Sequence, residues 1–124
     1  AAEDGDLLAD PALVFRDRAC QLLGAWTSPG HQRSVIEIAG CPLAASVLAA
    51  TAALEVAVHG WDISRACGQR RPIPHALATD LLVMAPVLVP ATGRHSLFAA
   101  PVTVAATATP SDRLAAFLGR PLRA

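Results

Sequence analysis

Apolar and polar residues recur along much of the chain with the spacing of helices. Over residues 12–26, apolar side chains appear at roughly helical intervals beside one polar face. Asp10 followed by Pro11 is typical of a helix start, and the Ser, Pro and Gly at residues 28–30 are typical of a helix stop. The pattern therefore predicts a first helix over residues 12–26.

The longest apolar segment covers residues 43–67, which are rich in Ala and Leu and contain no Pro. Gly68 follows this segment as the expected C-cap. Residues 38–54 carry no charge, but Gly40 and Pro42 interrupt this run, and it is shorter than the roughly 20 apolar residues of a membrane span. We therefore expect an apolar helix buried at the centre of a bundle, and no membrane partner.

Two more helices are expected towards the C-terminus. Residues 75–89 are helical by composition, and Pro86 should kink this helix or end it early. Ser111 and Asp112 are expected to cap a short helix over residues 113–118, which Gly119 ends.

Extended structure is expected in two short places. Residues 34–38 form one such piece, and residues 99–107, where Val and Thr alternate, predict a short strand or an extended arm. The predicted fold class is therefore all-α: one domain over residues 1–124, a partial four-helix bundle with a short extended segment near the C-terminus.

Composition and charge exclude several classes of protein. Hydrophobic residues make up 53% of the 124 residues, so a largely disordered chain is excluded. Ten basic residues balance ten acidic ones, which leaves no basic footprint for nucleic acid. Because only 16% of the residues are charged, we expect a homo-oligomer that covers apolar surface. All ten basic residues are Arg, which indicates a GC-rich, actinobacterial coding background.

The cysteines and the N-terminal segment indicate a cytoplasmic protein. Cys20, Cys41 and Cys67 are odd in number and form no C-x-x-C motif, so we expect reduced and mostly buried thiols. The acidic residues 1–10 have neither the basic nor the apolar region of a signal peptide.

One constellation carries candidate chemistry. Glu55 and His59 are four residues apart on the longest predicted helix, and Asp62 follows three residues later on the same face. A carboxylate and an imidazole inside an apolar helix are unfavourable unless a partner satisfies them. A divalent metal is one such partner, since carboxylate oxygen and His nitrogen both bind zinc. The alternative is that Glu55 and His59 form a structural pair.

Asp62 also has two interpretations. It either accepts a hydrogen bond from His59, which would fix the imidazole tautomer, or it pairs with Arg65 three residues later. Trp61, between these polar residues, is expected in the core or at the rim of the bundle.

The run ALEVAVHGWDISRACGQ (residues 53–69), followed by SDRLAAFLGRP (residues 111–121), resembles the mycothiol-dependent maleylpyruvate isomerase family. Its small actinobacterial members are built on a DinB-like four-helix bundle, commonly with Glu-x-x-x-His-Gly-Trp-Asp on one helix and Asp-Arg-Leu-x-x-x-Leu-Gly-Arg near the end. The resemblance implies that Glu55 and His59 bind a divalent metal, usually zinc. It also implies that the metal receives the sulfur of a thiol cofactor, mycothiol in the isomerase, as a nucleophilic thiolate.

The chain departs from the family pattern at the third metal ligand. That ligand is normally a His on an early helix, after a Gly-Trp pair, but here Trp26 is followed by Thr27, Ser28 and Pro29, which cannot continue such a helix. We expect the ligand to come from residues preceding Ala1, from another subunit, or from a replacement His. The candidate replacements are His31, His75 and His95.

These observations give two expectations of function. The first is a metal-dependent transferase or isomerase that uses mycothiol and acts on a small electrophile. The alternative is a truncated, metal-free helical module with a binding or structural role, which self-associates to cover apolar helix faces.

Overall fold

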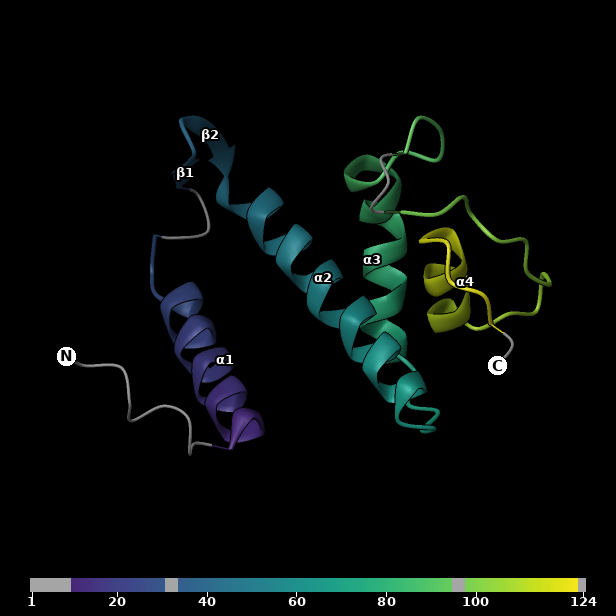
Figure 1. Ribbon diagram of the computed structural model, residues 1–124. Helices are drawn as coiled ribbons and strands as arrows, with labels where there is room; N and C mark the ends of the chain where they lie inside the picture. Colours follow the sequence, from purple (N-terminus) through teal and green to yellow (C-terminus); the bar gives the residue numbers. More distant parts are fainter. Residues whose placement is uncertain (1–9, 31–33, 95–97, 123–124) are drawn as a thin grey trace. The chain divides into compact units, whose positions relative to one another are not determined.

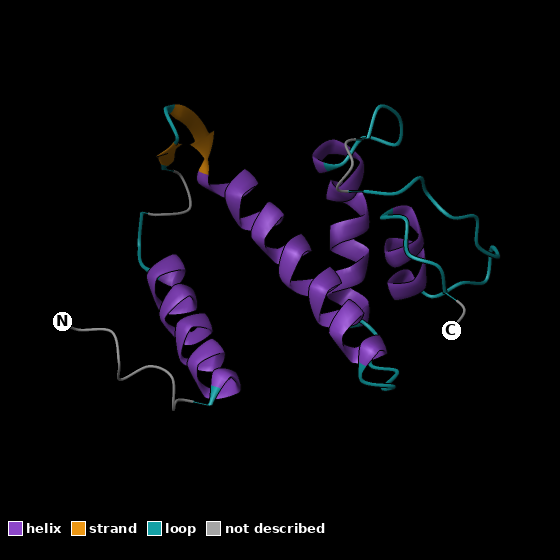
Figure 2. Cartoon of the chain, in the orientation of Figure 1, coloured by secondary structure: helices purple, strands orange, loops and turns teal. Residues whose placement is uncertain are grey.

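The computed structural model describes residues 10–30, 34–94 and 98–122, and the chain divides into two compact units, Ala1–Ser46 and Val47–Ala124. In the described part of the chain there are four helices (Figure 1), and the strands there are confined to one short hairpin (Figure 2). The structure confirms a mostly helical protein. Within the described residues, no helix has both the length and the apolar character needed to cross a membrane.

The first unit contains helix α1 (Pro11–Thr27) and a hairpin of β1 (Val35–Ile38) and β2 (Cys41–Ala44). As expected, Asp10 caps α1: its carboxylate accepts a hydrogen bond of 2.9 Å from the Ala12 amide, and Pro11 takes the first helical position. None of the residues of α1 is buried.

The hairpin turns tightly between its two strands. The strands are antiparallel, with Val35 opposite Ala44 and Ile38 opposite Cys41. The two linking residues, Ala39 and Gly40, both have positive φ (51° and 79°), the conformation of a type I′ turn. The extended piece at residues 34–38 is thus confirmed as β1. Residues 43 and 44, expected in a helix, instead lie in β2.

The second unit holds the core. Helix α2 (Ala45–Ala66) begins directly after β2, and α3 (His75–Leu88) and α4 (Pro110–Phe117) follow it along the chain. Helices α3 and α4 pack side by side (Figure 1). The core draws on all three helices, the loop before α3 and the ends of α3 and α4: Leu54, Val58, Trp61, Ile73, Ala78, Leu81, Ala85, Val89, Leu114, Ala115 and Leu118.

Helix α2 is only partly buried. Leu54, Val58 and Trp61 form its buried side, but Val56 and Ile63 are 58% and 64% exposed. The expectation of a helix buried all round is therefore wrong. In an Ala-rich helix, the exposed side can also carry small or branched apolar residues. The sequence then has no polar stripe that distinguishes the exposed side from the buried one.

The helix ends differ in detail from the sequence prediction. Gly68 ends α2 as expected, with its φ at 69°. Helix α3 continues through Pro86 to Leu88, so an early end there is wrong. Pro86 is exposed and two residues before the end of the helix, so its ring removes one hydrogen bond and the helix continues for less than a turn beyond it. Helix α4 starts at Pro110 and its N-cap is Thr109, one turn earlier than predicted.

The segment before α4 is an extended arm. Among its described residues, 98–109, no strand forms (Figure 2). The Val102 amide donates to the carbonyl of Ala116 at 2.8 Å, which ties the arm to α4. Of the two forms expected for residues 99–107, the structure has the arm.

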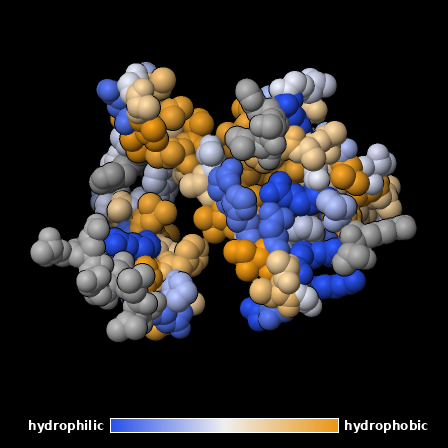
Figure 3. All heavy atoms as spheres, in the orientation of Figure 1, coloured by the Kyte–Doolittle hydropathy of each residue, from blue (hydrophilic) through white to orange (hydrophobic). Residues whose placement is uncertain are grey.

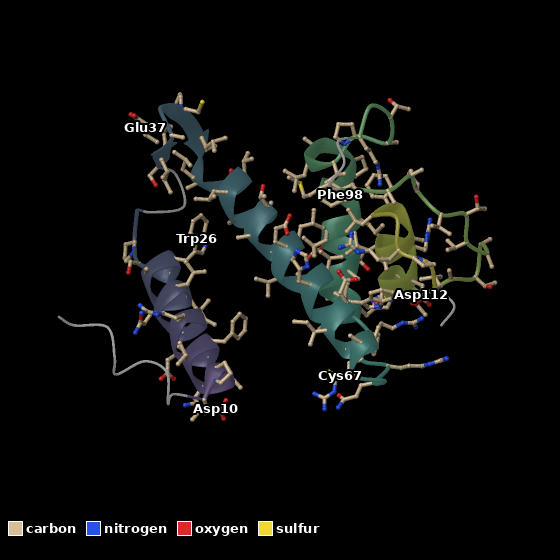
Figure 4. All side chains as sticks on the ribbon, in the orientation of Figure 1. Asp10, Trp26, Glu37, Cys67, Phe98 and Asp112 are labelled. Carbon is tan, nitrogen blue, oxygen red and sulfur yellow. The ribbon has the colours of Figure 1, made fainter. Side chains whose placement is uncertain are left out.

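The three cysteines are free and exposed, so the prediction of mostly buried thiols is wrong. Cys20 lies on α1, Cys41 begins β2 and Cys67, which is labelled in Figure 4, follows the last residue of α2. Each cysteine therefore lies outside the core, although the apolar character of a thiol favours burial.

Candidate metal site on helix α2

Glu55 and His59 face each other on one side of α2. Their i, i+4 spacing places His59 Nε2 3.0 Å from Glu55 Oε2. The two side chains are 48% and 62% exposed, so they lie at the solvent-facing surface of the helix rather than inside an apolar core. Water can therefore solvate both groups, and burial does not require a metal to satisfy them.

Asp62 approaches the other nitrogen of the same imidazole. Its Oδ2 lies 3.6 Å from His59 Nδ1, one turn further along the helix. At this distance the contact is electrostatic and longer than a hydrogen bond. The imidazole of His59 thus lies between two carboxylates, one facing each ring nitrogen.

Arg120 holds the Asp62 carboxylate from the far end of the chain. The guanidinium forms a two-point contact, Nη2 to Oδ2 at 2.8 Å and Nε to Oδ1 at 3.2 Å. Its Nη1 donates to the carbonyl of Leu118 at 3.0 Å. The planar guanidinium matches the geometry of a carboxylate in this arrangement, which fixes the orientation of Asp62.

The end of α4 brings Arg120 into place. The Gly119 amide donates to Ala116 O at 3.0 Å and the Arg120 amide donates to Ala115 O at 2.9 Å, the two bonds of a Schellman motif. This motif needs a residue with positive φ, and Gly119 has φ of 84°. The Gly-Arg pair that ends the helix therefore also aims the arginine at α2.

Arg65, the other partner considered for Asp62, makes different contacts. Its guanidinium lies over the ring of Trp61, 5.0 Å from the ring centre, and its Nη2 donates to Leu122 O at 2.7 Å. Trp61 is buried, as expected for a core residue. Asp62 lies beside His59 but beyond hydrogen-bond distance, at 3.6 Å, and its hydrogen-bonded partner is Arg120, which spacing alone did not indicate.

The donor atoms of Glu55 and His59 suit a small divalent cation. In tetrahedral zinc, with bonds of about 2.1 Å, two ligand atoms lie about 3.4 Å apart. The 3.0 Å separation of Oε2 and Nε2 is close to this value, and both side chains are exposed enough to move apart by a few tenths of an ångström. The 3.0 Å contact is itself that of a direct ion pair, the structural pair considered in the sequence analysis, and a shared metal would require the two donor atoms to move apart.

A complete ligand set is not present in the described residues. Within residues 10–30, 34–94 and 98–122, no group of three or more His, Cys, Asp or Glu side chains is placed to hold a metal ion. His75 is the first residue of α3. His31 and His95, the other replacement candidates, lie outside the described residues.

Comparison with known proteins adds no relative to this picture. No protein-family model matches the sequence, no curated protein matches it, and no solved structure matches the fold.

Proposed function

We propose that Glu55 and His59 bind a divalent metal, with zinc as the first candidate, and that the chain serves a transferase or isomerase that uses a thiol cofactor such as mycothiol. The observation that carries this proposal is the open Glu55–His59 pair, whose donor atoms lie 3.0 Å apart. The resemblance of residues 53–69 and 111–121 to the maleylpyruvate isomerase family supports it and supplies the thiol chemistry.

Each residue of the site then has a defined task. Glu55 Oε2 and His59 Nε2 would be the metal donors. With a small approach from the present 3.6 Å, Asp62 would accept a hydrogen bond from the N–H at His59 Nδ1, which leaves Nε2 free as a ligand. Arg120 would keep the Asp62 carboxylate in place through its two-point contact. The bound metal would supply Lewis acidity, which lowers the pKa of a thiol and keeps it as a thiolate.

The small electrophile would meet this thiolate at the open face of α2. Because Glu55 and His59 are exposed, a thiol and a substrate can reach them without rearrangement of the core. A third ligand from a second subunit or from another part of the protein would complete the metal site. Maleylpyruvate is the first electrophile to assay, since the resemblance points to it.

Metal content tests the proposal directly. The purified protein is dialysed against a weak chelator, given zinc in slight excess, dialysed again and analysed by elemental mass spectrometry. We expect about one zinc per chain. Glu55→Ala and His59→Ala should each lose most of it. Glu37→Ala, which removes an exposed carboxylate from β1, is the matched control and should retain the metal.

Different outcomes would overturn the metal site and the thiol chemistry. Equal zinc contents in the wild-type protein and the Glu55→Ala variant would overturn the metal site. Specific zinc binding without turnover of maleylpyruvate in the presence of mycothiol, or of a simpler thiol with a general electrophile, would overturn the thiol chemistry and leave the metal site standing.

A second candidate function is a metal-free module that self-associates. Apolar side chains are exposed at helical spacing on two helices: Val56 and Ile63, seven residues apart on α2, and Val83 and Val87, four apart on α3. Exposed apolar residues are also visible on the face drawn in Figure 3. A second copy of the chain would cover such surfaces.

Sedimentation velocity distinguishes this second candidate. Self-association predicts a dimer or larger assembly in the metal-free protein. The double variant Val83→Ser with Val87→Ser should shift this assembly towards monomer. Thr79→Ala, also on the exposed surface of α3, is the control. A metal-free wild-type protein that sediments as a monomer at all concentrations would exclude it.

A further inference from the structure

A pocket lies where α2 ends and the loop to α3 begins. It has a volume of about 350 Å³, within the range of roughly 300–1,000 Å³ that small-molecule sites occupy. Its lining includes the apolar residues Trp61, Pro72 and Leu122 and three arginines, Arg65, Arg70 and Arg71. Neither Glu55 nor His59 lines it.

The charge of this pocket is strongly positive. Its lining residues include three arginines and one acidic residue, Asp112, which gives a formal charge of +2. Asp112 is also engaged at the start of α4, where its Oδ2 accepts a hydrogen bond of 2.9 Å from Thr109 Oγ1 (Asp112 is labelled in Figure 4). For a chain whose ten basic and ten acidic residues balance, this is a local excess of positive charge.

The backbone that carries the arginines is fixed. Ser64 Oγ donates to Gln69 O at 2.9 Å and accepts from the Arg71 amide at 3.0 Å, so one buried hydroxyl holds both sides of the loop. Two residues later, the Ile73 amide donates to Ser111 Oγ at 2.9 Å, which ties the loop to α4. The loop therefore holds Arg70 and Arg71 at the pocket with little loss of backbone freedom on binding.

The side chains divide into a fixed cation and two available ones. Arg65 is held over Trp61 and by Leu122 O. Within the described part of the chain, the guanidinium groups of Arg70 and Arg71 have no hydrogen-bond or ion-pair partner. Guanidinium groups form paired hydrogen bonds with the oxygens of carboxylate and phosphate, and two free ones beside an apolar wall suit an anion with an apolar body.

We infer that this pocket binds a small organic dianion, with its oxyanion on Arg70 and Arg71 and its apolar body against Pro72 and Leu122. Carboxylate and phosphate share the chemistry that the pocket recognises, and the experiment separates them. The site is distinct from the proposed metal site, so its occupancy does not depend on Glu55 and His59.

Isothermal titration calorimetry at low ionic strength tests this inference with phenyl phosphate and phthalate as dianions, and phenol as the neutral counterpart of phenyl phosphate. We expect saturable binding of at least one dianion and none of phenol. Arg70→Gln with Arg71→Gln should weaken binding by about tenfold or more, because charge-assisted hydrogen bonds are lost. Arg113→Gln, which removes an exposed arginine of α4 that does not line the pocket, should change affinity by less than about twofold.

The titrations of the two dianions and of the variants decide whether the pocket binds an anion and of which class. Binding of phenyl phosphate alone assigns a phosphorylated ligand, and binding of phthalate alone assigns a dicarboxylate. The absence of saturable binding of either dianion, or an equal loss in the Arg113→Gln control, would overturn the inference. Circular dichroism confirms that the variants are folded. The Glu55→Ala variant should retain anion binding, which separates this site from failure of the metal site.

Discussion

Asp62 and Arg120 join the two sequence motifs of the protein, although 58 residues separate them. The carboxylate on α2 accepts two hydrogen bonds from the guanidinium that follows α4, and it also lies 3.6 Å from the imidazole of His59. One ion pair therefore links the C-terminal helix to the candidate site. The pair is partly buried, with side-chain exposures of 34% and 20%.

A double-mutant cycle measures what this link contributes. Asp62→Asn and Arg120→Gln should each lower the free energy of unfolding, and the double variant should lose less than the sum, with a coupling of about 1 kcal/mol. Urea denaturation gives the four values. The exposed pair Arg16–Asp17, at 3.3 Å, is the matched control, and its coupling should be close to zero. Equal couplings in the two cycles would contradict the prediction.

Local signals along the sequence predict the helices, although the starts of α2 and α4 differ from the prediction. The Asp10-Pro11 start of α1 and the glycines that end α2 and α4 depend on neighbouring residues only, and each is found as expected. The strand β2 was missed because it contains Pro42 and shows no alternation. Its extended form arises from pairing with β1, which no local pattern encodes.

The contacts of the candidate metal site were predictable only in part, because some of them join residues far apart in the sequence. The Glu55–His59 contact follows from i, i+4 spacing on one helix. The Asp62–Arg120 contact depends on how α4 docks on the rest of its unit, and charge spacing on α2 pointed to Arg65 as an equal candidate. Burial was misjudged for the cysteines and for α2 because residue type indicates a tendency to be buried, whereas packing decides which face is covered.

Gly119 should be the least replaceable glycine of the described chain. It has φ of 84°, and a Cβ there would lie 2.6 Å from the carbonyl oxygen of Ala99. Gly119→Ala should lower the free energy of unfolding by about 3 kcal/mol, from left-handed strain plus the clash. Gly68→Ala is the matched control: φ is 69° in the same type of helix cap, but nothing lies within 4 Å, so about 1 kcal/mol is expected. If thermal or urea denaturation shows similar losses of unfolding free energy for Gly119→Ala and Gly68→Ala, the structure relieves the clash with Ala99.

Exposed thiols predict fast chemical modification. In native protein at neutral pH, we expect an aromatic disulfide reagent to modify all three cysteines, with the same final stoichiometry as in denaturant, because each side chain is accessible. Absorbance of the released thiolate counts the reacted groups. Single Cys→Ser variants assign the rates to Cys20, Cys41 and Cys67. A thiol that reacts only after denaturation would show that another surface covers it in solution.

Ser111 should stabilise the fold through a hydrogen bond that no other residue replaces. Ser111 is 3% exposed, and its hydroxyl accepts from the Ile73 amide at 2.9 Å, between α4 and the loop that carries Arg70 and Arg71. Ser111→Ala leaves that amide buried without a partner, at a cost of about 1–3 kcal/mol in urea denaturation. Thr79→Ala, which removes an exposed hydroxyl bonded to His75 O, is the control and should cost less than about 0.5 kcal/mol. Equal costs would mean that water reaches the Ile73 amide. Because Ser111 fixes the loop, the same variant should also weaken dianion binding about twofold to fivefold, whereas Thr79→Ala should leave it unchanged.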